Sequence, residues 1–424
     1  MGSLIIVMAL LFTLILGMPI ALGIGVSSLA YLLFKGGIPL QLAPQMLANG
    51  LDSYNVIAIP FFILAAQIMN AGGVTDKLMK FASAAVGHFK GGLAHVNILT
   101  SMLFAGMSGS AVADSAGLGK ILIPAMKEKG YGADYSAAVT AASSTIGPII
   151  PPSVPMVIYG ILAEASISSL FLAGALPGVI MGLLMIIMSY YFAVKNDYPA
   201  EKKSTFKEML TAFYKAIPAL LTPVIILGGM WGGIFSPTEA AAVAVGYAII
   251  QGLVAKELTF KGLWDSLKDA SIYAASIMLI VASAKLFGWI ISTEQIPIKF
   301  TNFILSITQS KYIILFIINL FLLAVGAFME IIAIMLMTVP VFLPLMQQLG
   351  IDPVHFGVVM VLNLMIGLLS PPFGLSLYIA QDIADISYSK AVKATIPYIL
   401  LILSILFIIT YWPQFVMFLP NLLG

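Results

Sequence analysis

Small polar residues and one acid gather at a single point inside an apolar segment of the chain. Within Gly106–Gly119, Ser108-Gly109-Ser110 is followed one helical turn later by Asp114. Gly, Ser and Ala in a row predict an unwound tip whose carbonyl and hydroxyl oxygens can coordinate a small hard cation such as Na⁺. An ionisable group within an apolar segment is costly and indicates function. We therefore expect an ion site at this tip, with Asp114 in coupling or substrate binding.

A run of hydroxyl residues precedes an interruption in another apolar segment, Ile146-Gly-Pro-Ile-Ile-Pro-Pro-Ser153. Two consecutive prolines remove backbone hydrogen bonds and clash with the preceding turn, so the helix must unwind there. The alternative is that these small residues only let helices pack closely. The candidate Na⁺ ligands of this half are Ser108, Gly109, Ser110, Ser143, Ser144, Thr145 and Gly147, and the candidate substrate or coupling residues are Asp114, Pro151, Pro152 and Ser153.

The interruption recurs at an offset of 220 residues, as Ile366-Gly-Leu-Leu-Ser-Pro-Pro-Phe373. Shared Gly and Pro indicate shared backbone geometry, whereas shared aliphatic residues mean little in so apolar a chain. Corresponding breaks in two halves of one chain are the best sequence indication of a transporter's binding site. The coinciding positions are Gly106/Gly326, Pro124/Pro344, Gly130/Gly350, Gly147/Gly367, Pro151/Pro371 and Pro152/Pro372.

The second tip, Gly326-Ala-Phe-Met-Glu330, has no hydroxyl group, so the two sites are not copies. Glu330 has three interpretations: it neutralises a cation, orients the hairpin, or accepts a proton in a coupling step; we favour a site-shaping role. The candidate Na⁺ ligands of this half are Gly326, Asn363, Gly367 and Ser370, and the candidate substrate or coupling residues are Glu330, Pro371 and Pro372.

Three further charges have two interpretations each. Lys285, the only cation deep in a long apolar segment, either meets an anionic substrate or pairs with Glu330. Lys120 either pairs with Asp114 or extends to the cytoplasmic face. Asp114 itself is either functional or a structural acid that accepts hydrogen bonds from nearby serines.

Composition predicts a polytopic membrane protein. The chain has 424 residues, of which 61% are hydrophobic and 9% charged, whereas soluble domains have about 25% charged residues. All 20 basic residues are lysine and cysteine is absent, so the chain offers no arginine clamp for an anion. The net charge of +2, with lysines at helix ends and in loops, gives no indication of a nucleic acid partner.

Several apolar segments are too short to span a bilayer, which takes about 20 helical residues. They form two pairs, 92–106 with 111–126 and 312–327 with 331–347, which suggests two re-entrant hairpins. We interpret 4–34 as the first span. The remaining spans are expected at 55–72, 135–163, 168–194, 216–235, 238–255, 270–292, 355–380 and 394–412.

The lysines predict the orientation of these segments, because cytoplasmic loops carry an excess of Lys. The Lys-rich connection 195–215 is therefore cytoplasmic, and only Lys35, Lys299 and Lys311 fall outside. The predicted fold class is an all-α polytopic membrane protein with two inverted-topology repeats, two re-entrant hairpins and two Pro-broken helices. The predicted divisions are 1–194 (first repeat, hairpin 92–127, broken helix 135–163), 195–237 (Lys-rich cytoplasmic loop and connecting helix) and 238–424 (second repeat, hairpin 312–347, broken helix 355–380).

Enzymatic chemistry is not expected. Ser236-Pro-Thr-Glu239 has the pattern of a helix capping box with Pro at the first helical position. The chain contains no P-loop, and Asp114 stands alone on its segment without a convergent catalytic set. An ion gradient must therefore supply the work of transport.

Five ordered motifs resemble the large membrane subunit of a tripartite ATP-independent periplasmic (TRAP) transporter, over essentially the whole chain. They are Ser108-Gly-Ser-Ala-Val-Ala-Asp114, Lys127-Glu-Lys-Gly-Tyr131, the first Pro-Pro break, Ser236-Pro-Thr-Glu-Ala-Ala-Ala242 and Leu369-Ser-Pro-Pro-Phe-Gly374. The resemblance implies a sodium-driven importer of organic acids in the bacterial inner membrane, with an elevator mechanism. It also implies two partners, a small four-helix membrane subunit and a periplasmic substrate-binding protein.

By position, the resemblance places sodium sites on Ser108–Ser110 with Ser143–Gly147, and around the second tip with Gly367–Pro371. The first tip is similar to that of members handling sialic acid and related sugar acids. Without arginine, an anionic substrate would be bound by helix N-termini, backbone amides and hydroxyls. The alternatives are a C4-dicarboxylate subunit of the same family and a stand-alone Na⁺/dicarboxylate symporter of similar architecture.

Overall fold

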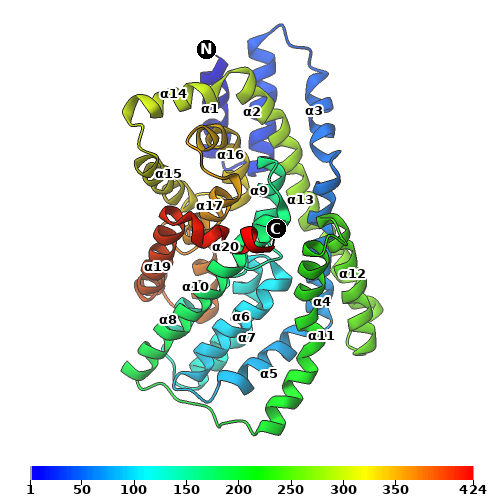
Figure 1. Cartoon of the computed structure of the whole chain (residues 1–424), viewed down its shortest axis with the longest axis vertical. Helices are drawn as coiled ribbons and strands as arrows, with labels where there is room; N and C mark the ends of the chain where they lie inside the picture. The colour runs from blue at the N-terminus through cyan, green and yellow to red at the C-terminus, as the bar shows by residue number, and fades with distance from the viewer. Residues whose placement is uncertain (1, 424) are drawn as a thin grey trace.

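The computed structural model describes residues 2–423, which form twenty α-helices, one short 3-10 helix and no strand (Figure 1). The predicted all-α class is therefore confirmed. Seven helices are long and apolar enough to cross a membrane, and six of them coincide with predicted spans. The seventh, Ile331–Gln348, belongs to the second predicted hairpin.

The helices of the first half follow the predicted segments, except that the predicted span 4–34 is two helices and that residues 42–51 form a helix that was not predicted. They are α1 (Gly2–Ile15), α2 (Ile20–Lys35), α3 (Leu42–Leu51), the 3-10 helix η1 (Tyr54–Ile57), α4 (Ala58–Ala71), α5 (Val74–Val86), α6 (Gly92–Ser108), α7 (Ala111–Glu128), α8 (Ala133–Ser144), α9 (Val154–Ala163) and α10 (Ile167–Lys195).

The rest of the chain comprises the connecting helix and the helices of the second half. Its helices are α11 (Phe206–Trp231), α12 (Pro237–Val254), α13 (Phe260–Thr293), α14 (Ile296–Ile307), α15 (Lys311–Gly326), α16 (Ile331–Gln348), α17 (Pro353–Gly367), α18 (Leu375–Ala384), α19 (Tyr388–Tyr411) and α20 (Pro413–Leu423). Helices α7 and α16 begin at 111 and 331 and end at 128 and 348, so the offset of 220 holds at both ends. The orientation of the two halves relative to a bilayer stays a prediction.

Our prediction of a single span at 4–34 is wrong. The chain turns between α1 and α2, and the two helices pack against each other, with Thr13 Oγ1 and Ser27 Oγ 3.4 Å apart. Gly17 adopts a φ of +70°, which favours glycine, and Pro19 cannot continue a helix. The segment is also longer than one span needs.

The two predicted hairpins and the two breaks form where expected. Gly109, with φ +56°, and Ser110 connect α6 to α7, while residues 327–330 connect α15 to α16. Each Pro-Pro pair lies between two short helices, α8 and α9 or α17 and α18, and both Pro-Pro bonds are cis. The predicted capping box is also present, because Ser236 and Glu239 bond reciprocally at the start of α12.

The halves interlock around the breaks. Helix α9 packs against α16 of the second half, and α18 packs against α7 and α8 of the first. Helices α10 and α19 pack on these elements and on α6, α8 and α17. A separate group is formed by α2, α3, α4, α12 and α13, which pack against one another. We call this group the scaffold. Helices α3, α4 and α12 lie at the right of Figure 1.

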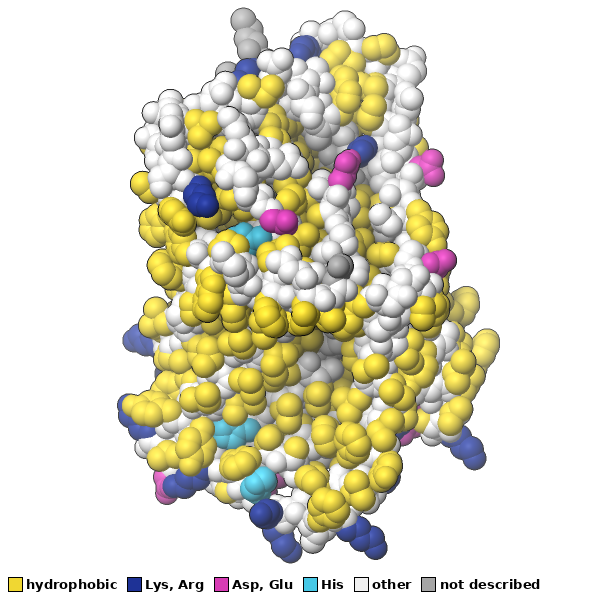
Figure 2. Space-filling view, viewed as in Figure 1, with side chains coloured by type: hydrophobic (Ala, Val, Ile, Leu, Met, Phe, Trp, Pro, Cys, Tyr) yellow, Lys and Arg dark blue, Asp and Glu magenta, His cyan; other side chains and the backbone are white. Residues whose placement is uncertain are grey.

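The outer surface suits a membrane. Figure 2 shows apolar side chains over most of one face, with lysines gathered at its lower end. That end carries the beginnings of α8 and α11 (Figure 1) and is the end that we predict to be cytoplasmic.

Candidate functional site: a cavity between the two hairpin tips

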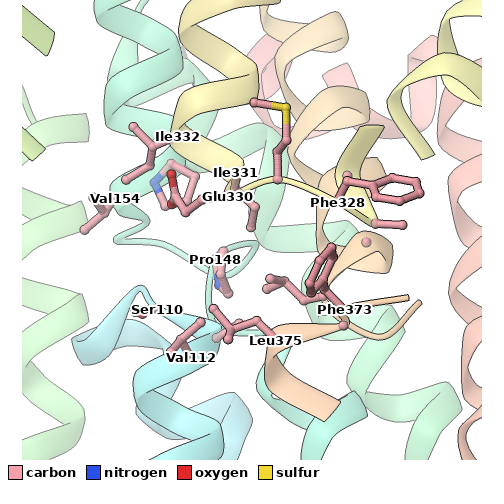
Figure 3. A pocket seen from close by; sticks show the side chains of 18 of the residues that line it. Ser110, Val112, Pro148, Val154, Phe328, Glu330, Ile331, Ile332, Phe373 and Leu375 are labelled. Carbon is pink, nitrogen blue, oxygen red and sulfur yellow. The ribbon is translucent and has the colours of Figure 1, made fainter. Parts of the chain in front are cut away.

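One cavity of about 260 Å³ lies where the two hairpin tips meet the two breaks (Figure 3). We call it the tip cavity. Each predicted half-site contributes some residues to this one space: Gly109 and Ser110 from the first, and Gly326, Glu330 and Gly367 from the second. The other predicted site residues do not line it. Its lining comprises residues 109–112, 148, 154–155, 326–332, 367–368 and 373–375, with Tyr273 from scaffold helix α13.

Four helices begin at the tip cavity. The first residues of α7, α9, α16 and α18 are Ala111, Val154, Ile331 and Leu375, and all four line it. A helix N-terminus carries a partial positive charge and unpaired N–H groups, so it favours an anion. The lining residues include no lysine. The arrangement therefore provides backbone groups for an anionic ligand, as we expected in a chain without arginine.

Behind the first tip, Asp114 is fully buried. Neither of its carboxylate oxygens has a hydrogen-bond partner among the described residues. A β-carbon at Gly147 would lie 2.7 Å from Asp114 Oδ2, so the carboxylate approaches the backbone just before the first Pro-Pro break. The Ser108 hydroxyl lies near this carboxylate, so the functional and the structural interpretation of Asp114 both stay predictions. Lys120 is exposed and does not pair with Asp114.

The predicted hydroxyls before the break point to different neighbours. Ser144 Oγ accepts a 2.7 Å hydrogen bond from Ser115 of α7 and donates one to Ala141 O. The Ser143 hydroxyl accepts a hydrogen bond from Ser101 of α6 at 3.0 Å. Helix α8 is thereby tied to both helices of the first hairpin.

Further hydrogen bonds lie within α8 and between α8 and α6. Thr145 Oγ1 donates to Ala142 O of its own helix. Asn97 of α6 donates a 2.6 Å hydrogen bond to Thr140. Asn97 and Ser101 were not among the predicted residues, although their spacing of four places two polar groups on one face of an apolar helix.

The first tip touches the first break through backbone atoms. A β-carbon at Gly109 would lie 3.0 Å from Pro152 O, so glycine lets the tip approach the break. Ser153 is the N-cap of α9, where its hydroxyl accepts a 3.2 Å hydrogen bond from Met156 N. Ser108 Oγ accepts a hydrogen bond from Ser110 N at 3.4 Å. The structure thus brings Ser108–Ser110, Asp114, Gly147 and the first Pro-Pro pair together.

The second tip and break meet even more closely. The backbones of Gly326 and Gly367 leave no room for a β-carbon at Gly367. Asn363 donates a 2.7 Å hydrogen bond to Asn319 Oδ1 of α15, while its own buried Oδ1 has no partner among the described residues. Ser370 Oγ donates to Ile366 O.

Glu330 faces the tip cavity (Figure 3) and also caps α16, because its carboxylate accepts a 3.1 Å hydrogen bond from Ala333 N. A site-shaping position therefore fits its contacts. Our alternative of a buried pair with Lys285 is wrong: Lys285 is exposed, lines a different cavity and makes no ion pair within residues 2–423. Position along a segment does not reveal which side of the helix a residue occupies.

Comparison with known proteins assigns the family. A family model described as the tripartite ATP-independent periplasmic transporter, DctM component, matches residues 5–415. The chain belongs to this family. It is therefore a large TRAP permease subunit with a role in transport and a multi-pass protein of the inner membrane.

Curated relatives in the DctM family are named for different acids. The chain is 41% identical over 407 residues to the sialic acid TRAP transporter large permease protein SiaM of Vibrio cholerae, covering 96% of this chain and 95% of that protein. It is 39% identical to the sialic acid TRAP transporter permease protein SiaT of Haemophilus influenzae, covering all of this chain and 69% of that protein. It is 38% identical to the C4-dicarboxylate TRAP transporter large permease protein DctM of Pseudomonas aeruginosa, with coverages of 94% and 93%.

Solved structures of other transporters share the fold of this DctM member. The YdaH transporter of Alcanivorax borkumensis superposes with a TM-score of 0.64 at 13% identity, covering 89% of each chain. MtrF of Neisseria gonorrhoeae superposes with a TM-score of 0.60, also at 13% identity, covering 91% of this chain and 84% of that one. These likenesses support the transporter architecture and carry no information on the substrate.

Proposed function

We propose that this subunit imports an organic acid, sialic acid or a related carboxylate, driven by co-transported Na⁺. The main support is the tip cavity, where four helix N-termini converge and where α7 carries the fully buried carboxylate of Asp114 one turn after its first residue. In this proposal a periplasmic binding protein delivers the acid, and a small four-helix membrane subunit completes the assembly.

The tip cavity suits an anion that also has apolar surface. Val112, Phe328, Phe373 and Leu375 provide apolar walls (Figure 3), while the helix N-termini offer N–H groups to a carboxylate. The two relatives named for sialic acid are 41% and 39% identical to the chain, compared with 38% and 35% for the two named for C4-dicarboxylates, while a relative named for isethionate is 40% identical. We propose sialic acid as the first substrate to test and a C4-dicarboxylate as its alternative.

The first tip offers chemistry that fits a sodium ion. A buried carboxylate without partners is costly, and a bound cation would offset that cost. Asp114 supplies the negative charge. The first tip, Ser108–Ser110, and the segment before the first break, Ser143–Gly147, supply hydroxyl and carbonyl oxygens near this carboxylate. At the second tip the unpartnered Asn363 Oδ1 is the corresponding oxygen. Na⁺ bound at both tips would neutralise the carboxylate and draw the acid to the cavity.

An elevator movement fits the packing of the helices. The hairpins, broken helices, α10 and α19 interlock with one another, whereas the scaffold helices pack mainly among themselves. We propose that the first group, the transport body, moves as one unit along the scaffold. The binding of Na⁺ and of the acid between the two tips would permit this movement.

Reconstitution in proteoliposomes tests the proposal. The subunit is combined with a candidate small membrane subunit and a candidate binding protein, and uptake of labelled sialic acid or a labelled C4-dicarboxylate is measured under imposed Na⁺ or H⁺ gradients. We expect uptake only with the binding protein and an inward Na⁺ gradient. Uptake without the binding protein would favour the stand-alone symporter, and uptake driven by H⁺ alone would refute sodium coupling.

A further inference from the structure

A second large cavity surrounds Lys285. It encloses about 870 Å³ between scaffold helices α3 and α13 and the turn from α9 to α10. We call it the Lys285 cavity. Because α13 leads through Thr293 to Lys299, which we predict to lie outside, this cavity belongs to the predicted periplasmic half of the molecule.

The lining of the Lys285 cavity suits a polar anion. The Lys285 side chain is exposed to the cavity and makes no ion pair among the described residues. Asn49 and Asn55 add amide groups, and Ser166 caps the N-terminus of α10. An ammonium group, amides and a helix N-terminus are groups that bind carboxylates. Glu164 is the one acid in the lining, and it forms no ion pair with Lys285.

Two helices connect the Lys285 cavity to the tip cavity. Helix α9 begins at the tip cavity with Val154 and ends at the Lys285 cavity, and its ten residues span about 15 Å. Scaffold helix α13 contributes Tyr273 to the tip cavity and Lys285 to the other, and the twelve positions between them span about 18 Å. The two lengths agree, so a shift of the transport body by that distance brings the hairpin tips to the level of Lys285.

We propose that Lys285 is a carboxylate-binding residue of the outward-facing state, placed on the scaffold where the acid enters. The inference rests on the proposed import of an organic acid. Lys285 attracts the anion from the periplasmic side and binds its carboxylate until the hairpin tips enclose it. The tip cavity, which has no lysine in its lining, then carries the acid past Tyr273 to the other side.

Three substitutions test this role in the reconstituted assembly. Lys285→Gln removes the charge and keeps much of the length, Lys285→Arg retains the charge, and Lys311→Gln removes another exposed lysine of the predicted periplasmic side. Uptake of labelled acid with saturating binding protein is measured against substrate concentration. We expect Lys285→Gln to raise KM about tenfold or more with Vmax within about twofold, since a hydrogen bond to a charged group is lost. Lys285→Arg and Lys311→Gln should keep the KM of the unmodified protein.

The possible results distinguish a failure of the Lys285 role from a failure of the proposed function. Loss of all uptake by Lys285→Gln with recovery in Lys285→Arg would also support it, because the charge alone distinguishes them. If the unmodified assembly transports the acid and Lys285→Gln has the same KM, the role of Lys285 is refuted while the function stands. An equal rise in KM for Lys311→Gln would likewise refute it, by showing a general effect of surface charge. Absence of uptake by the unmodified assembly would instead refute the proposed function.

Discussion

At the scale of residues, the buried Asp114 carboxylate determines what the first tip can do. A carboxylate that is removed from water and has no hydrogen bonds is destabilising by several kcal/mol unless a cation or a proton compensates for it. This cost couples ion binding to the stability of the hairpin, because an ion that binds only the folded state stabilises it.

Replacing Asp114 with alanine should remove this coupling. We expect sodium-dependent uptake by Asp114→Ala to fall at least about tenfold, since each 1.4 kcal/mol of lost ion binding is a factor of ten. The melting temperature of the unmodified protein should rise with NaCl relative to choline chloride, while that of Asp114→Ala should stay constant. Asp269→Ala, which removes an exposed acid of α13, is the control and should respond to Na⁺ normally. A normal sodium response in Asp114→Ala would mean that Asp114 has a structural role and takes no part in sodium binding.

Substitution of Ser144 also tests the proposed ion site at the first tip, through a shift in sodium affinity instead of a loss of uptake. The Ser144 hydroxyl joins α8 to Ser115 of the first hairpin, so its removal leaves the Ser115 hydroxyl without its acceptor. We expect Ser144→Ala to raise the Na⁺ concentration for half-maximal uptake several-fold. Ser136→Ala, whose hydroxyl bonds only to Gly132 O at the far end of α8, should leave the sodium curve unchanged. Coincident curves for Ser144→Ala and the unmodified protein would exclude Ser144 from the ion site.

At the scale of elements, the Pro-Pro breaks and the hairpins were predictable because Gly and Pro act on the backbone locally. The turn between α1 and α2 was not predicted, although Gly17 and Pro19 mark it, because uniform apolar composition cannot distinguish one long helix from two short ones. The bond from Asn97 to Thr140 joins residues 43 positions apart, so only the fold reveals it. Likewise, no sequence pattern indicated that Tyr273 lines the tip cavity.

The contact between the second tip and the second break sets a strict limit on residue size. Because the Gly326 backbone occupies the position that a β-carbon at Gly367 would take, Gly367→Ala forces α15 and α17 apart. We expect a loss of at least about 2 kcal/mol of stability, in the range of overpacked cores, seen as a lower melting temperature in detergent. Gly246→Ala in α12 meets open space and should be neutral or stabilising by up to about 1 kcal/mol. Equal melting temperatures for the two variants would contradict this close contact.

At the scale of the whole molecule, one face of α13 defines the path of the proposed movement. Tyr273 and Ala284 lie eleven positions apart on α13, which is about three turns, so they share one face of the helix at a separation of about 17 Å. Tyr273 lies beside the first hairpin tip, because it lines a cavity together with Ala113, whereas Ala284 lines the Lys285 cavity. Travel of the transport body along this face would exchange one neighbour of the tip for the other.

Cysteine cross-linking can follow this exchange without a background signal, because the natural chain contains no cysteine. We expect Ala113→Cys with Tyr273→Cys to cross-link in the conformation described here, and Ala113→Cys with Ala284→Cys to cross-link only after the transport body has moved along α13 toward Lys285. Adding Na⁺ and the acid should change the ratio of the two yields, since ligands shift populations according to their differential affinity. Ala113→Cys alone serves as the control. Should the second pair fail to cross-link under every condition that supports uptake, the hairpin does not travel along α13, and alternating access must come from a smaller opening of the tips.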